Sequence, residues 1–432
     1  MQNRYLTAKP EAGLAAWEIQ QCIAESLREY RNARRVLLVP PDISRSNAYA
    51  GPIVGFLRAF FHSADIDLLP ALGTHTPMTR AEVESMYGDF PLARVHAHDW
   101  RTGTVKLGTV DGAHISSISS GLLDASIDVE INSRLFDPDY DLIVSIGQVV
   151  PHEVAGFANY TKNVLVGCGG LGMINGSHYL GAMYGMERLM GRAKNPVREL
   201  YNSAASRFLS GLPLAYILTV TTMAATGLRV EGVSIGQGDE LFFETAKLSR
   251  AKNITVLPEP IEKAVVYLDE TKFRTTWVGN KAIYRTRMAL ADGGKLVIIA
   301  PGLHGCGEDA HNDTLIKQYG YRPAQEVTAA VRQDPDLAEN LAVAAHLIHG
   351  SSDGRFGVTY APGQMKEEGI RSLGYEYMPL ETALAQYDIA KLRDGFNDVR
   401  GERIFFIRNP ALGLWTTADK YNSLEERGGA CC

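Results

Sequence analysis

Six side chains stand at positions where their types suit chemistry. They are Asp42, Arg45, His75, His152, Lys162 and His178. Histidine changes its charge near neutral pH and can move a proton. Arginine binds planar carboxylate or phosphate groups through paired hydrogen bonds. The lysine and two of the histidines share a glycine-rich stretch, which is unusual for a segment that only packs. The set predicts proton transfer on a small anionic molecule.

The first two candidates follow an apolar run at residues 35–40 that predicts a buried strand. Asp42 and Arg45 come directly after this run, and a helix is predicted over residues 52–62. A guanidinium beside the free backbone N–H groups of a helix start suits a carboxylate or a phosphate. Asp42 can then hold Arg45 in place or bind a hydroxyl. The competing interpretation is an ion pair on a surface loop.

A second strand is predicted over residues 66–72, and Gly73-Thr74-His75 follows it. Thr79 and Glu82 have the spacing of a capping box, which begins a helix. His75 therefore lies between a strand end and a helix start, where it can transfer a proton. The competing interpretation is a histidine that hydrogen-bonds a turn.

The third predicted strand, residues 141–146, precedes the segment that holds His152, Lys162 and His178. Glycines at 167, 169, 170, 172 and 176 lie in the same segment. Glycine at this density lets a backbone approach a flat or charged ligand closely.

The same glycines allow another interpretation, the dinucleotide site of an NAD-dependent dehydrogenase. Gly167 to Gly172 match the pattern GxGxxG after a predicted strand at residues 164–166, and Glu187 lies about 20 residues further on, as in a dinucleotide site. Residues 173–177 make a poor first turn of a helix, and such a unit usually opens its domain, so the pattern is weak.

Short apolar runs alternate with helix-length segments, which predicts an α/β fold with mostly parallel sheets. Helices are predicted over residues 14–30, 277–291 and 337–349, and further strands over residues 264–268, 295–300, 356–360 and 404–407. Two prolines in residues 250–260 separate two series of elements, which predicts domains at 1–255 and 256–432. In open α/β sheets ligands bind beyond the carboxyl ends of the strands, so the candidates should share one edge.

Composition narrows the class of protein. The 432 residues are 45% hydrophobic and 21% charged, which indicates a globular protein rather than disorder or coiled coil. Net charge is −6, so neither nucleic acid nor a membrane surface is indicated as a partner. The sequence shows no spanning segment or signal peptide, and we expect a cytoplasmic protein. None of the five cysteines forms a CxxC pair; Cys431 and Cys432 end a predicted loose tail that could bind metal.

Taken together, the motifs resemble those of the lactate racemase family, the nickel-pincer-nucleotide enzymes. The matching pieces are Asp42 to Arg45, Gly73 to His75, Pro151-His152, Gly156-Phe157, Lys162, His178, Trp277 to Lys281, and Asp292-Gly293-Gly294. The intervals from His152 to Lys162 and from Lys162 to His178 match the family pattern. The resemblance covers nearly the whole chain.

The resemblance implies two α/β domains with the active site in the cleft between them, the C-terminal domain closing over the site. It implies a nickel-pincer nucleotide, in which nickel is bound to pyridinium-3-thioamide-5-thiocarboxylic acid mononucleotide. Lys162 would carry this cofactor covalently, and His178 would coordinate the nickel, a metal that imidazole suits. Proteins that build the cofactor would be partners in maturation.

The resemblance also implies an isomerase that racemises or epimerises a 2-hydroxy acid. His75 and His152 would be the two acid/base histidines, one for each enantiomer, while hydride leaves C2 for the cofactor and returns. Arg45 and Lys281 would bind the substrate carboxylate or the forming oxyanion. Asp42 would orient Arg45 or touch the substrate hydroxyl.

Three departures from the family pattern affect the expected substrate. Residues 158–161 replace a Ser-Gly-Gly run, Thr76 replaces an arginine, and Trp277-Val278 replaces a tyrosine–glutamine pair. The loss of an arginine removes an anionic contact, and Trp277 makes the pocket wall more apolar. We therefore expect a substrate larger and more apolar than lactate. Drift within an unchanged specificity is the alternative.

Two further function classes stay open at this point. One is a racemase that deprotonates carbon with the two histidines and uses no nickel. The other is a non-catalytic protein that carries the cofactor. The first would exchange the C2 hydrogen with solvent, and the second would leave every hydroxy acid unchanged.

Overall fold

A computed structural model of the chain describes residues 1–224 and 227–422, so Cys431 and Cys432 lie outside the described part. The chain forms two compact units. Unit 1 comprises Met1–Leu180 and Met190–Asn253, and unit 2 comprises Gly181–Leu189 and Ile254–Cys432. The segment Gly181–Leu189, which the sequence analysis placed in the N-terminal domain, therefore packs with the C-terminal part of the chain.

Unit 1 is built on a six-stranded sheet in the order β1-β10-β9-β6-β2-β3. Its strands are β1 (Arg4–Thr7), β10 (Gly227–Gly236), β9 (Leu214–Ala224), β6 (Leu142–Gln148), β2 (Arg35–Val39) and β3 (Asp65–Leu68). Strands β9, β6, β2 and β3 pair in parallel. Strands β1 and β10 extend the sheet in antiparallel pairing. Two small antiparallel pairs accompany it, β4 (Thr104–Val110) with β5 (Ile127–Asn132) and β7 (Pro151–His152) with β8 (Gly156–Phe157).

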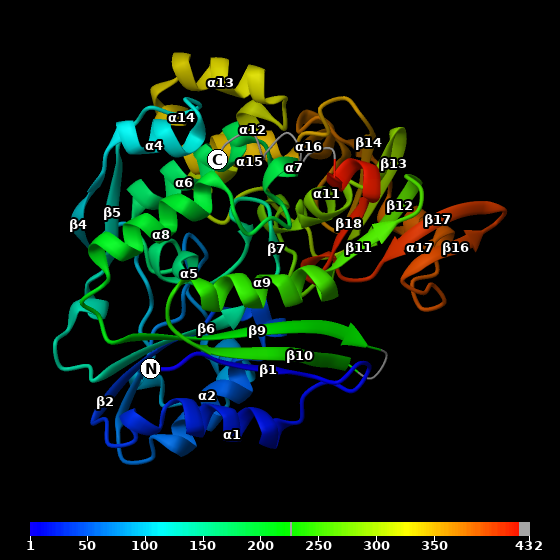
Figure 1. The fold of residues 1–432 in the computed structure, drawn as a ribbon. Coiled ribbons are helices and arrows are strands. Elements are labelled where there is room, and N and C mark those ends of the chain that lie inside the picture. The colour runs from blue at the N-terminus through cyan, green and yellow to red at the C-terminus, as the bar shows by residue number, and fades with distance from the viewer. Residues whose placement is uncertain (225–226, 423–432) are drawn as a thin grey trace. The chain divides into compact units, whose positions relative to one another are not determined.

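Helices cover both faces of this sheet, with α1 and α2 on one face and α5, α8 and α9 on the other (Figure 1). The helices of unit 1 are α1 (Ala16–Ser26), α2 (Ala50–Phe60), α3 (Arg80–Tyr87), α4 (Gly112–Ser119), α5 (Thr161–Leu165), α8 (Pro196–Phe208) and α9 (Asp239–Asn253). Helix α6 (Leu171–Tyr184) begins in unit 1 and ends in unit 2.

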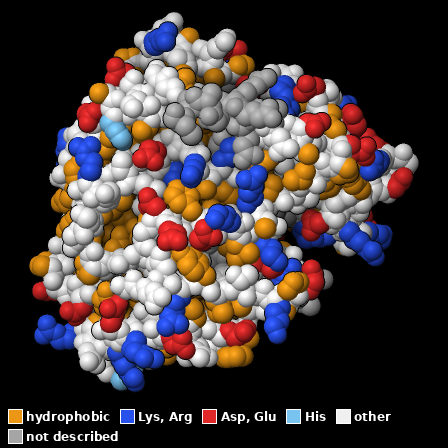
Figure 2. Space-filling view, in the orientation of Figure 1, with side chains coloured by type: hydrophobic (Ala, Val, Ile, Leu, Met, Phe, Trp, Pro, Cys, Tyr) orange, Lys and Arg blue, Asp and Glu red, His pale blue; other side chains and the backbone are white. Residues whose placement is uncertain are grey.

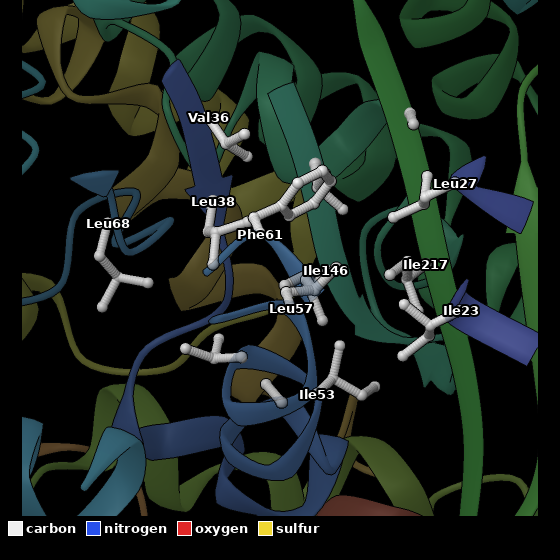
Figure 3. Packing of buried hydrophobic residues seen from close by; sticks show 14 of the residues in the cluster. Ile23, Leu27, Val36, Leu38, Ile53, Leu57, Phe61, Leu68, Ile146 and Ile217 are labelled. Atoms are coloured by element: carbon white, nitrogen blue, oxygen red, sulfur yellow. The ribbon is translucent and has the colours of Figure 1, made fainter. Parts of the chain in front are cut away.

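The core of unit 1 lies between α1, α2 and the sheet. Ile23 and Leu27 at the end of α1 lie beside Ile217 of β9, and Leu38 of β2 and Ile146 of β6 lie near Phe61 in the same cluster (Figure 3). All are at most 1% exposed. Burying each such side chain contributes roughly 1.5–3 kcal/mol, so this layer fixes the central parallel strands and their carboxyl ends.

Unit 2 has its own six-stranded sheet in the order β15-β14-β13-β12-β17-β16, parallel except for the β16–β17 pair. The strands are β15 (Glu376–Tyr377), β14 (Gly357–Pro362), β13 (Leu290–Ala300), β12 (Ile261–Tyr267), β17 (Glu402–Ile407) and β16 (Gly395–Val399); β11 (Ile254–Leu257) pairs with β18 (Leu414–Thr417). The helices are α7 (Met186–Leu189), α10 (Thr276–Gly279), α11 (Lys281–Thr286), α12 (Ala310–Tyr319), α13 (Ala324–Gln333), α14 (Pro335–Glu339), α15 (Leu341–Gly350), α16 (Glu367–Ser372) and α17 (Leu380–Gln386).

The predicted fold class, α/β with mostly parallel sheets, is confirmed, and the predicted strands are present with shifted ends. Strand β3 ends at Leu68, four residues before the predicted end, because Pro70 cannot donate to a ladder. The helix predicted over residues 277–291 is wrong in detail. It consists of two short helices that meet at Asn280, and residues 290–291 already belong to β13. The helix predicted over residues 337–349 is likewise divided, at Asn340 between α14 and α15.

The surface is mixed in charge. On the face shown in Figure 2, Lys and Arg side chains are interspersed with Asp and Glu. Among the described residues, no helix is long and apolar enough to cross a membrane.

Candidate active site

Three predicted residues of unit 1 lie where β2 and β3 end. Pro41 and Ala71 form a parallel bridge just beyond the two strands, so the segments after them leave the sheet together. Asp42 is the residue directly after Pro41, and His75 lies four residues after Ala71. The carboxyl edge of the sheet thus positions the pair, as parallel α/β sheets do for ligand sites.

Asp42 and His75 are in direct contact, with 2.5 Å between Oδ2 and Nδ1. Asp42 is 5% exposed and also accepts hydrogen bonds from the backbone N–H and the hydroxyl of Ser44. Burial by itself would raise the pKa of Asp42, but the charge and hydrogen bond of His75 and the bonds from Ser44 outweigh it and lower the pKa to about 2. An ionised Asp42 requires the proton of His75 on Nδ1, which leaves Nε2 as a proton acceptor.

Arg45 lies in the 3₁₀ helix Ile43–Ala48, which Asp42 caps. Its guanidinium makes no hydrogen bond or ion pair within the described residues, and it acts on Asp42 through charge alone. The two oxygens of Asp42 bind Ser44 and His75, so Asp42 makes no hydrogen bond to Arg45. The charge of Arg45 is left to act on an anion.

His152 has the opposite arrangement from His75. It lies in the short strand β7, is 5% exposed, and its Nδ1 accepts the backbone N–H of Val154 at 3.1 Å. A neutral ring in this position carries its proton on Nε2 and offers a donor there. Glu153 Oε1 lies 3.8 Å from that Nε2.

Lys162 is half-buried in the first turn of α5 and follows a loop with an unusual backbone. Asn159 and Tyr160 have φ of 65° and 59°, although neither is glycine. Each such residue costs on the order of 1–3 kcal/mol and persists only where its surroundings enforce it. The next residue after Lys162, Asn163, donates to the carbonyl of Val39 at 3.1 Å and to Ser145 Oγ at 3.0 Å. The turn of helix that carries Lys162 is thereby tied to the end of β2 and the middle of β6.

His178 lies within α6, and its Nδ1 donates to the carbonyl of Ile174 at 2.6 Å. This bond fixes the proton on Nδ1 and leaves the lone pair on Nε2, as in histidines that bind metal. Among the described residues no group of three or more His, Cys, Asp or Glu converges on a metal position. A cofactor that brings its own nickel ligands needs one protein nitrogen, and His178 fits that requirement.

The glycine-rich segment does not form the predicted dinucleotide loop. Residues 164–166 end the helix α5 and are not a strand, and residues 173–177 lie inside the helix α6. A Cβ at Gly172 would lie 2.8 Å from the Asp128 carbonyl, so the glycine serves packing against β5. The Glu130 carboxylate accepts the N–H of Gly172 at 2.9 Å, where a pyrophosphate would have to bind.

Glu187, the predicted ribose ligand of that alternative, has a different task in unit 2. Its carboxylate pairs with Arg287 at 3.0 Å, with Arg355 at 2.7 Å and with Lys420 at 3.4 Å. Burial would raise the pKa of Glu187, but these cations lower it. The structure gives the dehydrogenase interpretation no support.

Trp277 and Lys281 follow β12 in unit 2, in the helices α10 and α11. The Trp277 ring lies 4.5 Å from the ring of His346. His346 is bonded through Nδ1 to the hydroxyl of Tyr284 and through Nε2 to that of Tyr321, both at 2.9 Å. A buried aromatic network thus fixes the wall to which Trp277 belongs.

Sequence reasoning missed one set of residues, the polar face of α8 that contacts the loop before Lys162. Asn195, Arg198 and Asn202 form this face. The available signal was their spacing of three and four residues, which places them on one side of a helix. Polar residues at that spacing also describe an ordinary solvated face, so the pattern alone does not separate the two.

Residues 17–190 match the family model described as the lactate racemase N-terminal domain. This match identifies a domain of the lactate racemase kind in the N-terminal part of the chain, and it supports an enzyme of the racemase or epimerase class.

Two solved structures have the same fold. A crystal structure of a protein from Thermotoga maritima is 22% identical, with a TM-score of 0.81 over 95% of this chain and 100% of that chain. The lactate racemase apoprotein from Thermoanaerobacterium thermosaccharolyticum is 16% identical, with a TM-score of 0.64 over 93% of each chain. No curated protein matches the chain.

Proposed function

We propose that the protein is a nickel-pincer-dependent racemase or epimerase of a 2-hydroxy acid. The observation that carries this proposal is the Asp42–His75 pair at the carboxyl ends of β2 and β3, within the residues that match the lactate racemase N-terminal domain. The pair supplies a proton acceptor for a hydroxyl group at the place where such sheets bind ligands.

Lys162 and His178 would hold the cofactor, the first covalently and the second through Nε2 to nickel. Their surroundings fit this role, because Asn163 ties the helix of the lysine to two strands and the Ile174 carbonyl holds the tautomer of the histidine. When bound, the cofactor would supply a reversible hydride acceptor for C2 of the substrate.

The acid/base chemistry belongs to the chain itself. His75 accepts the hydroxyl proton of one enantiomer at Nε2, while the negative charge of Asp42 stabilises the imidazolium that forms. His152 carries its proton on Nε2 and donates it to the oxygen when the other enantiomer forms, and in the reverse direction the deprotonated Nε2 accepts the hydroxyl proton. Arg45 would bind the carboxylate of the substrate, a role that the resemblance also gives to Lys281.

The substrate we propose is a 2-hydroxy acid with a side chain larger and more apolar than that of lactate. Trp277 supports this choice, because its ring is held by His346 as an apolar wall. Initial rates of racemisation of lactate, malate and phenyllactate by the same holoenzyme test it. We expect phenyllactate to have the highest kcat/KM, and a clear preference for lactate or malate would refute the substrate class.

The cofactor is tested by intact mass and metal content. The chain is produced with and without the proteins that build the cofactor. We propose that these proteins act in the same compartment as the chain, the cytoplasm. We expect a mass adduct on the peptide that contains Lys162, with one nickel per chain, only in the first preparation. A Lys162→Arg variant is the control and should carry no adduct. Racemisation by adduct-free parent protein would overturn the proposal.

A further inference from the structure

Helix α8 presents a row of polar side chains to the loop that precedes Lys162. We call residues 155–161 the lysine loop. Asn195 caps the helix, Arg198 follows three residues later and Asn202 four residues after that. Side chains at these intervals lie on one face of a helix.

This row contacts the lysine loop along its whole length. Asn195 Nδ2 donates to the carbonyl of Ala155 at 3.2 Å, and Asn202 Oδ1 accepts the hydroxyl of Thr161 at 2.9 Å. Arg198 makes three bonds between them. Its Nη2 donates to the Phe157 carbonyl at 2.7 Å, and its Nη1 donates to the Asn159 carbonyl at 3.3 Å and to Thr161 Oγ1 at 3.0 Å.

Arg198 is an unusual residue to find in a packing role. It is 1% exposed, and no carboxylate pairs with it among the described residues. Its Nε has no hydrogen-bond partner there. The guanidinium lies 4.0 Å from the ring centre of Phe242, which itself stacks on Tyr160 at 5.4 Å. Asp239 acts on the guanidinium through its charge but forms no ion pair with it. A buried charge that no carboxylate contacts is costly, so its retention calls for a task that an apolar residue cannot perform.

The backbone that Arg198 binds indicates what this residue does. Asn159 and Tyr160 both adopt positive φ, and Arg198 binds the carbonyl of the first and the hydroxyl of the residue after the second. The planar fork of arginine can bond several acceptors in a fixed geometry, whereas lysine is a point charge. We call Asn195, Arg198 and Asn202 the clamp. These residues hold the lysine loop in a conformation that the loop would not adopt alone.

We infer that Arg198 is a positioning residue that fixes the lysine loop and thereby directs Lys162 toward the cofactor. This inference rests on the proposed function in one respect, the identity of the group that Lys162 binds. The fixing of the loop itself does not depend on that identity.

The test compares Arg198→Lys and Arg198→Met with the parent chain, each made with the cofactor-building proteins. We expect the fraction of chains with an adduct on Lys162 to fall at least tenfold in both variants. We also expect backbone deuterium exchange in the peptide that covers residues 155–163 to rise at least tenfold in both, measured without cofactor. Failure of the lysine variant to rescue distinguishes geometry from charge.

The control is Phe406→Leu in the core of unit 2, where Phe406 is fully buried. It should lower the melting temperature while adduct and exchange at residues 155–163 remain at parent levels. If the arginine variants do not fold, Asn202→Ala removes one bond of the same clamp and should raise exchange in that peptide by a smaller factor. Parent-level exchange and adduct in Arg198→Met would overturn the inference.

The two proposals fail in different ways. If the parent never carries an adduct, the proposed function is wrong, and the exchange experiment still decides the role of Arg198. If the parent carries the adduct and Arg198→Met carries as much, the function stands and the positioning role is refuted.

Discussion

At the scale of single residues, the two proposed acid/base histidines differ in what their Nδ1 atoms contact. His75 Nδ1 meets the carboxylate of Asp42, whereas His152 Nδ1 meets the backbone N–H of Val154. The first contact requires a proton on Nδ1, and the second excludes one. The pair is therefore asymmetric before substrate binds, although both histidines were predicted from the sequence as equivalents.

This asymmetry can be measured in the apoprotein. Two-bond ¹H–¹⁵N correlation spectra of histidine-labelled protein at pH 8 should show His75 and His178 as Nδ1–H tautomers and His152 as an Nε2–H tautomer. The reason is the partner of each Nδ1 atom, a carboxylate, a carbonyl and an N–H group. Single His→Gln variants assign the signals. A shared tautomer for His75 and His152 would contradict the structure.

Asp42 should matter for rate more than for folding at neutral pH. We expect Asp42→Asn to lower kcat/KM by roughly 10²–10⁴-fold, the usual size of a general acid–base contribution, because His75 loses the charge that stabilises its protonated form. Ser44→Ala, which removes one bond to Asp42, is the matched control and should cost far less. Equal rates for Asp42→Asn and the parent holoenzyme would rule out the role of the pair.

The same carboxylate makes a prediction about acid stability. Its pKa is lowered to about 2 from an ordinary value of 3.8, so its contribution is complete above pH 3.8 and is lost as pH falls toward 2. The stability difference between the parent and Asp42→Asn should thus be constant, at about 2 kcal/mol, from pH 5 to 7 and shrink below pH 4. Urea denaturation at these pH values measures it. A difference that grows on acidification would contradict the direction of the pKa shift.

At the scale of elements, the strand ends were predictable and the helix after the glycines was not. The apolar runs of β2 and β6 are buried on both faces, a pattern that is readily recognised in a sequence. Helix α6 begins in a glycine-rich sequence with low helix propensity. It forms because Gly172 and Gly176 allow contact with Asp128 and Ile127 of β5, a tertiary reason that no local pattern reveals.

The packing role of Gly172 gives an element-scale prediction. In a free helix, alanine in place of glycine stabilises by roughly 0.5–1 kcal/mol. Here the new Cβ would lie 2.8 Å from a backbone oxygen, so we expect Gly172→Ala to destabilise by about 1–3 kcal/mol. Gly211→Ala, which meets no atom within 4 Å, is the control. Thermal denaturation compares them, and unchanged stability with altered NAD binding would revive the dinucleotide interpretation.

The clamp on α8 shows a second limit of sequence analysis at this scale. Asn195, Arg198 and Asn202 form a polar row that would suit solvent as well as a loop. Which one it meets depends on α5 and α9, whose positions follow from the sheet. The candidates at strand ends were found because their position relative to one edge follows from topology alone, and the clamp was missed because its position does not.

At the scale of the whole molecule, the chain crosses between its units more than once. The segment Gly181–Leu189 belongs to unit 2 although the chain before and after it belongs to unit 1. Within unit 2 this segment is held by Glu187, whose carboxylate meets Arg287, Arg355 and Lys420. A single division near residue 255 was the simplest prediction from the two series of strands, and it could not reveal this return.

Glu187 should therefore stabilise unit 2 through its charge. We expect Glu187→Gln to lower the free energy of unfolding at pH 7 by about 2–4 kcal/mol, because Arg287 is left partly uncompensated in a buried site. The pKa of Glu187 is lowered, so the difference from the parent should diminish as pH falls below the ordinary value of 4.5. Asp292→Asn removes an exposed partner of Arg355 and should change stability by under about 1 kcal/mol. Equal effects of the two variants in urea denaturation would contradict the stabilising role of Glu187.

The chain enters unit 2 within α6 and returns to unit 1 after Leu189, so neither unit is one continuous segment that could be produced alone. Ending a recombinant fragment at Asn253 would strand Met186 and Leu189, which are at most 5% exposed in the intact chain, without the surface that covers them. A fragment that begins at Ile254 would lack Glu187, a carboxylate that pairs with both Arg287 and Arg355. Neither half can be exchanged between relatives as one continuous segment. A chimaera that exchanges unit 2 has to exchange both Gly181–Leu189 and the chain from Ile254 onward.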